Sequence, residues 1–470
     1  MPCPRFCGPV LLLAGSALMS ACATIPDLGR APDPHVVERS ADAAPAAWPA
    51  SDWWRDYHDP QLDNLMAAAL EDAPTIATAV ARVRIAQGYA QQVGAALAPR
   101  IDATASAGLI QQSENLGIPA AFVPQGWQKT GKLGLGFSLD PDLWGARRAA
   151  RSAARADVDN AQFALAEARL VLTANIAATY AELARLHAQR DVLAAEEGIR
   201  IETLDLVRRR FAAGIEGEAQ LRQAESRVPS ARADLAACDE AIALTRDAVV
   251  ALIGEEPGRA GTITRPSITL LEPRGLPAGA TIALVGRRPD IAMARAGAEA
   301  AAERIKVARA AFYPNINLSG LIGLQSLGFS KLLTGSSTFG NVGPAVTLPI
   351  FQGGALAGQY RGARGQYDLA IAQYDQSVVD ALRQVADAMV SRDALAVRLD
   401  QSRAALTLAA RAAALARHRY AGGLSPYLDV LTAEEGLLQA RRNVSDLEAR
   451  AFAIDVSIVR ALGGGFAASA

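Results

Sequence analysis

Several residue types that enzymes and metal proteins rely on are scarce in this chain. Its 470 residues include four histidines and four cysteines that do not cluster, so we expect no metal site. We find neither a glycine-rich phosphate loop nor a nucleophile beside a base, and therefore expect no cofactor and no catalytic residues. The formal net charge of −1 gives no reason to expect a nucleic-acid partner. Together these absences argue against an enzyme.

Aromatic residues are also scarce, at 5% of the chain, whereas alanine is abundant. Small residues of high helix propensity suit long helices that pack closely together. Beyond residue 22 there is no run of about 18 apolar residues. We therefore expect no transmembrane helix.

The first 22 residues have the pattern of an export signal. Arg5 precedes an apolar run, residues 10–19, that is too short to span a membrane. We predict a signal peptide over residues 1–21. The small residues before Cys22 resemble the lipobox of bacterial lipoproteins, which implies that Cys22 is lipidated, with palmitate among the acyl chains. Ala23 then favours the outer membrane. The alternative is an ordinary signal cleaved nearby, with Cys22 incidental.

The rest of the chain divides into two similar halves. Residues 208–226 align with residues 417–435 at an offset of 209, and Pro74 and Pro289 each begin a helical pattern. We expect a lipid-anchored segment over 22–72 that starts an equatorial region, a first repeat over 73–254, a linker over 255–287, a second repeat over 288–462 and a flexible tail over 463–470.

Each half contains two stretches of period-two alternation, and these predict strands at about 101–112, 130–140, 315–325 and 341–351. Apolar residues alternate with small or polar ones, as in transmembrane β-barrel strands. Half-buried soluble hairpins are the alternative. Four strands cannot close a barrel, and hydrocarbon does not tolerate open edges, so a barrel would have to be shared between copies. Two copies would leave a filled interior, whereas three would leave room for a channel.

Long helical segments lie between the strand pairs. Residues 146 to about 213 contain no proline and one glycine, and partner helices are predicted over 217–252 and 425–462. Gly214 and Gly423 would mark the turns of two antiparallel helix pairs. Spacings of three and four predict coiled-coil seams through Phe163, Ala166, Leu170, Thr173, Ala177 and Tyr180, and through Ala372, Val379, Leu382, Ala386 and Met389.

Seven short motifs occur in one order along the chain: Trp53-Trp54 with Asp59-Pro60-Gln61-Leu62, Asp142-Leu143-Trp144-Gly145, Leu252-Ile253-Gly254, Arg287-Arg288-Pro289-Asp290-Ile291, Phe312-Tyr313-Pro314, Phe351-Gln352-Gly353-Gly354, and Arg419-Tyr420 with Gly423 and Asp429-Val430-Leu431. With the internal repeat, they make the chain resemble the TolC-like outer-membrane efflux factors, in particular the NodT-type lipoproteins. The resemblance covers nearly the whole mature chain.

The resemblance implies an internally duplicated α+β membrane protein. Three copies would form a 12-stranded barrel in the outer membrane and a helical coiled-coil barrel in the periplasm. A periplasmic membrane-fusion adaptor and an inner-membrane RND-type pump would be its partners. The implied function is a passive exit duct for small molecules such as drugs or toxic compounds. A duct for type I protein secretion is the alternative. A periplasmic adaptor without a pore fits less well, because adaptors normally have one helical hairpin.

The resemblance also places a gate where the tips of the helix pairs, residues 211–220 and 420–429, meet. There Tyr420 would bond an acidic residue, whose position holds Gln220 in this chain, and the position of a basic partner holds Ser425. Asp429 matches an aspartate that rings the constriction, while the second position of that ring holds Thr432.

Each tip residue also has a simpler interpretation. In the first tip, Phe211 stands where the second has Tyr420. Tyr420 could serve packing only, Asp429 could serve only the helix dipole, and Gly214 and Gly423 could be plain helix caps. Two further acidic residues would either dock the adaptor or simply be solvated, namely Glu216 and Glu218.

Overall fold

A computed structural model describes residues 25–33, 48–113, 115, 119–267 and 287–466. The predicted signal peptide and Cys22 lie outside these residues. The described residues form two compact units: those within 25–33, 83–161 and 294–374 in one, and those within 48–82, 162–293 and 375–466 in the other. Each unit combines segments from both halves of the sequence, so the units do not follow the predicted repeats. The division into repeats stays a prediction about the sequence.

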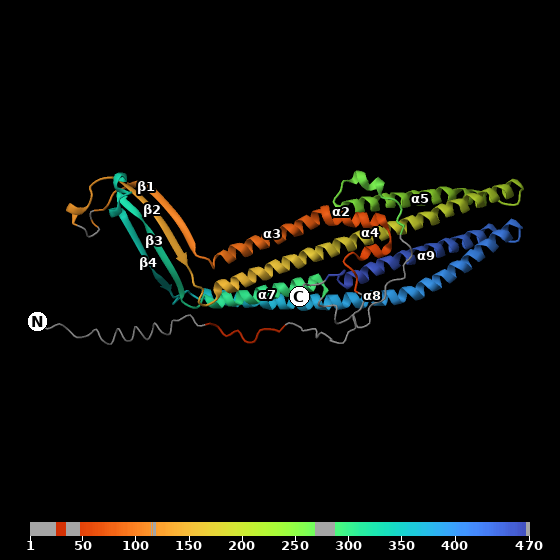
Figure 1. The fold of residues 1–470 in the computed structure, drawn as a ribbon. Helices are drawn as coiled ribbons and strands as arrows, with labels where there is room; N and C mark the ends of the chain where they lie inside the picture. The colour runs from red at the N-terminus through yellow and green to blue at the C-terminus, as the bar shows by residue number, and fades with distance from the viewer. Residues whose placement is uncertain (1–24, 34–47, 114, 116–118, 268–286, 467–470) are drawn as a thin grey trace. The chain divides into compact units, whose positions relative to one another are not determined.

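The first unit contains one antiparallel sheet in the order β1-β2-β3-β4 (Figure 1). Its strands are β1 (Arg100–Ile110), β2 (Gln128–Leu139), β3 (Asn315–Leu327) and β4 (Thr338–Thr347). β4 starts and ends a few residues before the predicted range. Pro349, which cannot donate a ladder hydrogen bond, lies beyond its end. Among the described residues, β1 and β4 each have a single neighbouring strand, so both outer edges of the sheet are open.

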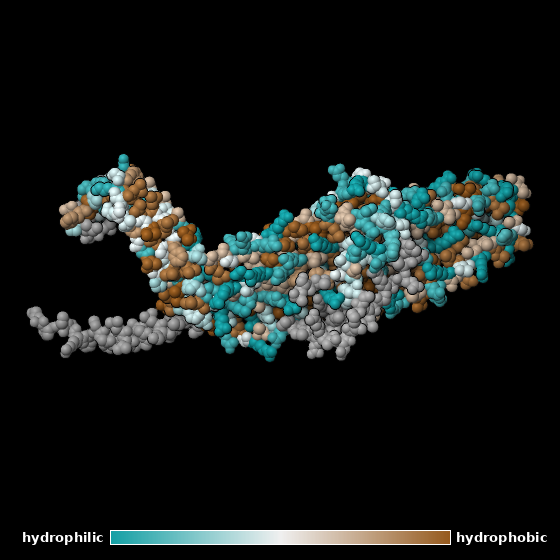
Figure 2. All heavy atoms as spheres, viewed as in Figure 1, coloured by the Kyte–Doolittle hydropathy of each residue, from teal (hydrophilic) through white to brown (hydrophobic). Residues whose placement is uncertain are grey.

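The pairing of the strands brings the alternating apolar residues onto one face. Residues directly opposite each other in an antiparallel pair share a face. One row across the sheet joins Ile101, Phe137, Gly320 and Val342, and the next joins Ala103, Leu135, Ile322 and Gly340. Ile322 is 67% exposed and Val342 is 79% exposed. Figure 2 shows apolar residues, in brown, over these strands. The opposite face carries small and polar residues, among them Asp102, Ser319 and Asn341.

Four long helices dominate the remaining structure. They are α4 (Ala146–Ala212), α5 (Glu218–Ile253), α8 (Ala355–Ala421) and α9 (Tyr427–Ala461). α4 and α8 both contain 67 residues, as expected of a duplication. The shorter helices are α2 (Pro60–Asp72), α3 (Pro74–Ala95) and α7 (Pro289–Ala310), and each begins at a proline. Short 3-10 turns are η1 (Trp53–Tyr57), η2 (Ala120–Phe122), η3 (Pro257–Thr262), η5 (Phe329–Lys331) and η6 (Gly335–Ser337).

The main core lies in the second unit, where η1 and α2 pack on α4, α5 and α9. Trp53, Tyr57, Met66 and Tyr180 are at most 2% exposed and belong to one apolar cluster. The Tyr57 hydroxyl donates a 2.7 Å hydrogen bond to the buried Asp455 carboxylate, which fixes the N-terminal segment to α9. The large aromatic residues of this region therefore hold the fold together. Within the described ranges, no helix combines the length and apolar character needed to cross a membrane.

The predicted coiled-coil seams differ in outcome. In α4, Leu170, Thr173, Ala177 and Tyr180 are buried, as predicted, whereas Phe163 and Ala166 are only half-buried. In α8 the prediction is wrong by one position. Val379 and Leu382 are 56% and 39% exposed, whereas the buried stripe comprises Ile371, Val378, Ala381, Val385 and Ala388. Because small residues occur on neighbouring stripes of α8, their spacing alone cannot select the stripe that packs within the chain.

Candidate functional site

The two helical hairpins of the second unit turn in the same way. Gly214 ends the α4 turn with φ 73°, and Gly423 ends the α8 turn with φ 74°. In each, the residue after the glycine donates to the carbonyl five residues earlier, at 2.9 Å in the first tip and 2.8 Å in the second. This is the Schellman motif, which needs a left-handed residue after the helix. The two glycines are therefore helix caps in matching tips (Figure 1).

Arg210 joins the first tip to the second. Its Nη1 donates a 2.7 Å hydrogen bond to the backbone carbonyl of Tyr420, and its guanidinium carbon lies 4.4 Å from the centre of the Tyr420 ring. Its Nε pairs with the Glu216 carboxylate at 3.3 Å. The Arg210 and Glu216 side chains are 13% and 11% exposed, so solvent screens this contact less than a surface pair. In the alignment of the two repeats Arg210 corresponds to Arg419, and no pattern in the sequence indicated the contact with Tyr420.

Tyr420 is fully buried within a small apolar cluster at the tips, next to Tyr427. Its hydroxyl has no hydrogen-bond partner among the described residues. Burial raises the pKa of this hydroxyl, and the Glu216 carboxylate raises the pKa further, so Tyr420 stays neutral. The expected bond between Tyr420 and Gln220 is not formed in the single chain. Arg210 and Glu216 occupy the surroundings of Tyr420, whereas Gln220 lies against its own turn at Gly217.

The other predicted gate residues lie on the surface of the second tip or close to it. Asp429 is exposed in the first turn of α9 and has no ion-pair partner among the described residues. Thr432 is exposed one turn further, where its hydroxyl donates to the Leu428 carbonyl at 3.0 Å. Ser425 has a buried hydroxyl oxygen that bonds no described group. In the described structure the Asp429 carboxylate therefore faces solvent without an ion-pair partner.

The first tip carries an exposed aromatic ring and one exposed acid. Phe211 is 40% exposed. Glu218 pairs with Arg222 at 3.2 Å, and their side chains are 70% and 67% exposed. Glu216 is tied to Arg210, so Glu218 is the better placed of the two acids for contact with another protein.

Glu434 forms a second connection between the hairpins that sequence reasoning missed. The side chain is 1% exposed and accepts hydrogen bonds from Arg200 at 2.7 Å, Arg417 at 2.9 Å and Thr203 at 3.0 Å. A carboxylate buried to this degree requires such partners. The available signal was the repeat itself, since Arg417 and Glu434 are both shared by the two halves. The corresponding pair in the first hairpin, Arg208 with Glu225, is 3.4 Å apart and more exposed.

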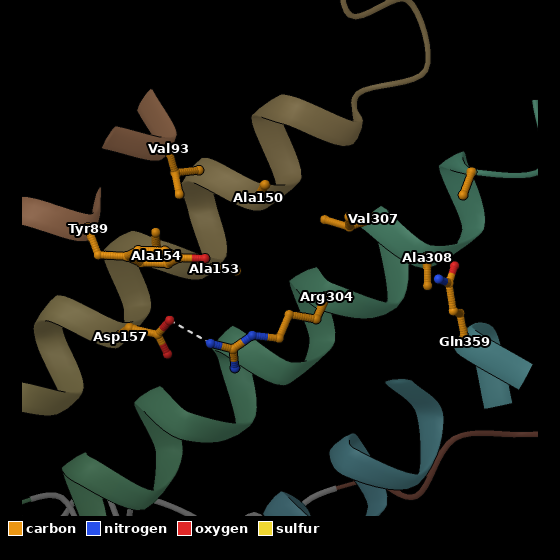
Figure 3. Close-up of a pocket in the computed structure, with 11 residues that line it drawn as sticks. Tyr89, Val93, Ala150, Ala153, Ala154, Asp157, Arg304, Val307, Ala308 and Gln359 are labelled. Atoms are coloured by element: carbon orange, nitrogen blue, oxygen red, sulfur yellow. Dashed lines mark hydrogen bonds and ion pairs between the residues drawn. The ribbon is translucent and has the colours of Figure 1, made fainter. Parts of the chain in front are cut away.

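The first unit contains a pocket of about 360 Å³. Its lining is mainly alanine and valine from α3, α4 and α7. Its two charged residues, Asp157 and Arg304, pair with each other at 2.5 Å (Figure 3). Because that pair is satisfied, no unpaired charge in the lining is left to select a ligand.

Residues of three motifs that carry the family resemblance hold backbone segments in place. In the first unit Trp144 Nε1 donates to the Pro314 carbonyl at 2.7 Å, and its ring stacks on Tyr313 at 4.8 Å. In the second unit Asp59 caps α2 and accepts a 2.8 Å bond from the Tyr180 hydroxyl. These contacts give Trp144, Tyr313 and Asp59 a structural role. The described residues contain no cluster of three His, Cys, Asp or Glu side chains that could hold a metal.

Comparison with known proteins identifies the family. The profile of the family described as "Outer membrane efflux protein" matches residues 65–255 and 283–464. The chain is 37% identical over 364 residues to the fusaric acid resistance protein FusA of Burkholderia cepacia, covering 74% of this chain and 67% of that one. It is 30% identical to the pyoverdine export outer membrane protein OpmQ of Pseudomonas aeruginosa, over 96% of each chain.

A solved structure agrees with these matches. The outer membrane protein VceC of Vibrio cholerae superposes with a TM-score of 0.85 and 40% identity, over 89% of this chain and all of that one. The predicted α+β channel fold, the location in the outer membrane and the function in efflux are confirmed at the level of the family. The chain therefore belongs to the family of outer membrane efflux proteins.

Proposed function

We propose that three copies of this chain form the passive exit duct of a tripartite efflux pump. The duct would receive small molecules from an inner-membrane RND-type pump through a periplasmic adaptor, and lipid on Cys22 would add an anchor in the outer membrane. One observation carries the proposal: the sheet has one apolar face and two open edges.

The open edges argue for a barrel shared between copies. Backbone groups left unpaired in hydrocarbon cost several kcal/mol each, so β1 of one copy has to pair with β4 of the next. Three copies give about twelve strands, enough to enclose water. The small and polar face, with Asp102, Ser319 and Asn341, would line the lumen, and the apolar face would meet lipid.

Small organic molecules are the substrate class that the relatives support. FusA is named for resistance to fusaric acid, and OpmQ is named for pyoverdine export. The chain has few histidines and methionines, which gives no sign of a route for metal ions. Choice of substrate would then belong to the pump and the adaptor, since a passive duct carries what it receives.

The helix tips are proposed as the gate of this duct. Tyr420 and Arg210 hold the two tips of one chain together, and Asp429 stands exposed beside them. In three copies the Asp429 carboxylates would ring the periplasmic mouth. Glu218 and the turns at Gly214 and Gly423 would be the first surfaces that an adaptor reaches.

Reconstitution of the purified protein in a planar lipid bilayer tests the proposal. We expect discrete single-channel conductance from a species with three times the mass of the chain. Absence of conductance from correctly folded protein, or a particle of one chain, would refute the proposal. A Cys22→Ser variant separates the anchor from the pore: we expect it to lose the lipid but still assemble and conduct.

A further inference from the structure

Two residues at the tips, Arg419 and Phe211, lack the contacts that their repeat counterparts make. At the offset of 209, Arg419 corresponds to Arg210, and Phe211 corresponds to Tyr420. Arg210 stacks on the Tyr420 ring and bonds the Tyr420 carbonyl within the chain. In the described structure Arg419 is exposed without a hydrogen bond or ion pair of its side chain, and the exposed Phe211 ring contacts no other aromatic ring or cation.

We infer that Arg419 of one copy stacks on Phe211 of the next copy and donates to the Phe211 carbonyl. The contact would repeat, between copies, the contact that Arg210 makes with Tyr420 inside each chain. A second copy of this chain is thus the partner of the exposed second tip. The inference rests on the proposed trimer and adds to it the residues that join neighbouring tips.

The internal duplication gives the geometric reason. In a closed ring of duplicated chains, first and second hairpins alternate, so the junction between copies brings a second hairpin against a first hairpin. The two tips have the same glycine caps, with φ of 73° and 74°. The Tyr420 carbonyl accepts from Gly423 N at 2.9 Å, as the Phe211 carbonyl does from Gly214 N. The Phe211 carbonyl of the next copy would therefore offer Arg419 the same acceptor that the Tyr420 carbonyl offers Arg210 within the chain.

The exposed face of α8 independently indicates that a second copy covers it. Leu408 and Leu415 lie there, 64% and 60% exposed, above the second tip. The repeat counterpart of Leu415 on α4 is Leu206, which packs partly buried against the tip cluster inside the chain. The apolar surface around Leu206 is thus covered within the chain, whereas the corresponding surface around Leu415 is exposed. A first hairpin from a neighbouring copy would cover it.

The junction between copies lacks the charged groups that strengthen the junction within the chain. Ser425 replaces the Glu216 that pairs with Arg210, so Arg419 has no carboxylate beside it. The counterparts of Arg200 and Thr203, which bond Glu434, are alanines at positions 409 and 412. The two tips of one chain would then move as one body, and the mouth would open between copies.

Chemical cross-linking in the assembled outer-membrane protein tests the contact. In an Arg419→Cys/Phe211→Cys variant, a short bis-maleimide should yield species of two and three times the chain mass. Arg411→Cys/Phe211→Cys is the matched control, because Arg411 lies on α8 about 12 Å from Arg419 along the helix. We expect the control to give single chains. If wild-type trimers form and conduct, but the reagent links no copies of the Arg419→Cys/Phe211→Cys variant, the inferred contact is wrong and the proposed duct stands.

If the wild-type protein forms no trimer, both the inferred contact and the proposed duct are wrong.

A conductance measurement gives a second readout that does not depend on cross-linking. Arg419→Ala should raise the resting conductance by about tenfold, because three exposed cation–π contacts are lost at once. Arg411→Ala should leave the resting conductance unchanged. Equal resting conductance of the Arg419→Ala and wild-type channels would contradict the inference.

Discussion

Glu434 is a single carboxylate on which two hairpins depend. It neutralises the 4%-exposed Arg200 and also bonds Arg417 and Thr203. Removing it leaves the buried Arg200 guanidinium with only the longer pair to Glu196, at 3.4 Å. Breaking a buried ion pair typically costs about 3–5 kcal/mol. We therefore expect Glu434→Ala to lower the thermal midpoint markedly and to make the α8–α9 tip sensitive to protease.

The first repeat supplies a control for that experiment. Glu225 is the counterpart of Glu434, but its partners Arg208 and Arg222 are largely exposed. Solvent weakens such pairs, so Glu225→Ala should leave the midpoint nearly unchanged. If Glu434→Ala and Glu225→Ala lowered the thermal midpoint equally, burial of Glu434 would not explain its contribution to stability.

Residue contacts across the hairpins were the least predictable part of the molecule. The aligned repeats contain Arg210, Tyr420 and Glu434, but only Tyr420 was singled out from the sequence. The alignment could not show that Arg210 bonds Tyr420, because the two residues are separated by 210 residues in the sequence. It shows which residues of the two repeats correspond, but it does not show which residues of the two repeats touch. The expected Tyr420–Gln220 bond was carried over from the resemblance and fails in the single chain, because Arg210 and Glu216 take that place.

The helix turns make a prediction at the level of elements. Gly214 and Gly423 have positive φ, and an added Cβ at either would meet no atom closer than 4.0 Å. Alanine there would suffer only the backbone cost of the left-handed conformation, about 1–2 kcal/mol. We expect either substitution to lower the thermal midpoint of the protein.

Gly198 provides the opposite case. It lies inside α4 with open space around it, and its repeat counterpart is Thr407. Gly198→Ala should therefore stabilise the helix by about 0.5–1 kcal/mol. If Gly198→Ala lowered the thermal midpoint as much as alanine at Gly214 or Gly423, backbone conformation would not explain these effects.

The two faces of the sheet can be distinguished by one substitution on each. Ile322→Arg places a charge on the apolar face, which should cost about 2–4 kcal/mol if that face meets lipid near the middle of the membrane. Asn341→Arg, on the opposite face and also exposed, should be tolerated. The amount of folded protein in the outer-membrane fraction measures the difference. Similar yields for both variants would refute the assignment of faces.

Elements were more predictable than contacts because their signals are local. The prolines at 74 and 289 begin helices as predicted, and the alternation of apolar residues marked all four strands, whereas α2 at Pro60 was not predicted. The α8 seam failed for a reason that local patterns cannot remove. Val379 and Leu382 form an apolar stripe as regular as the buried one, and only the arrangement in space decides which stripe packs inside the chain.

The assembled molecule makes a prediction about ion selectivity. Three Asp429 carboxylates around one mouth would raise the local cation concentration. Asp429→Asn should lower the potassium-to-chloride permeability ratio by about twofold or more, measured from the reversal potential across a salt gradient. Asp400→Asn, the same change in charge within α8, should leave the ratio as it was. An unchanged reversal potential in Asp429→Asn would exclude the acidic ring.

The two unpaired edges of the sheet have a genetic consequence. If β1 of each chain must pair with β4 of a neighbour, one defective chain spoils the whole ring. In a cell that makes equal amounts of normal and edge-defective chains, only about one ring in eight would contain three normal copies. An allele damaged at either edge strand should therefore be dominant over the normal one, with efflux reduced far below half.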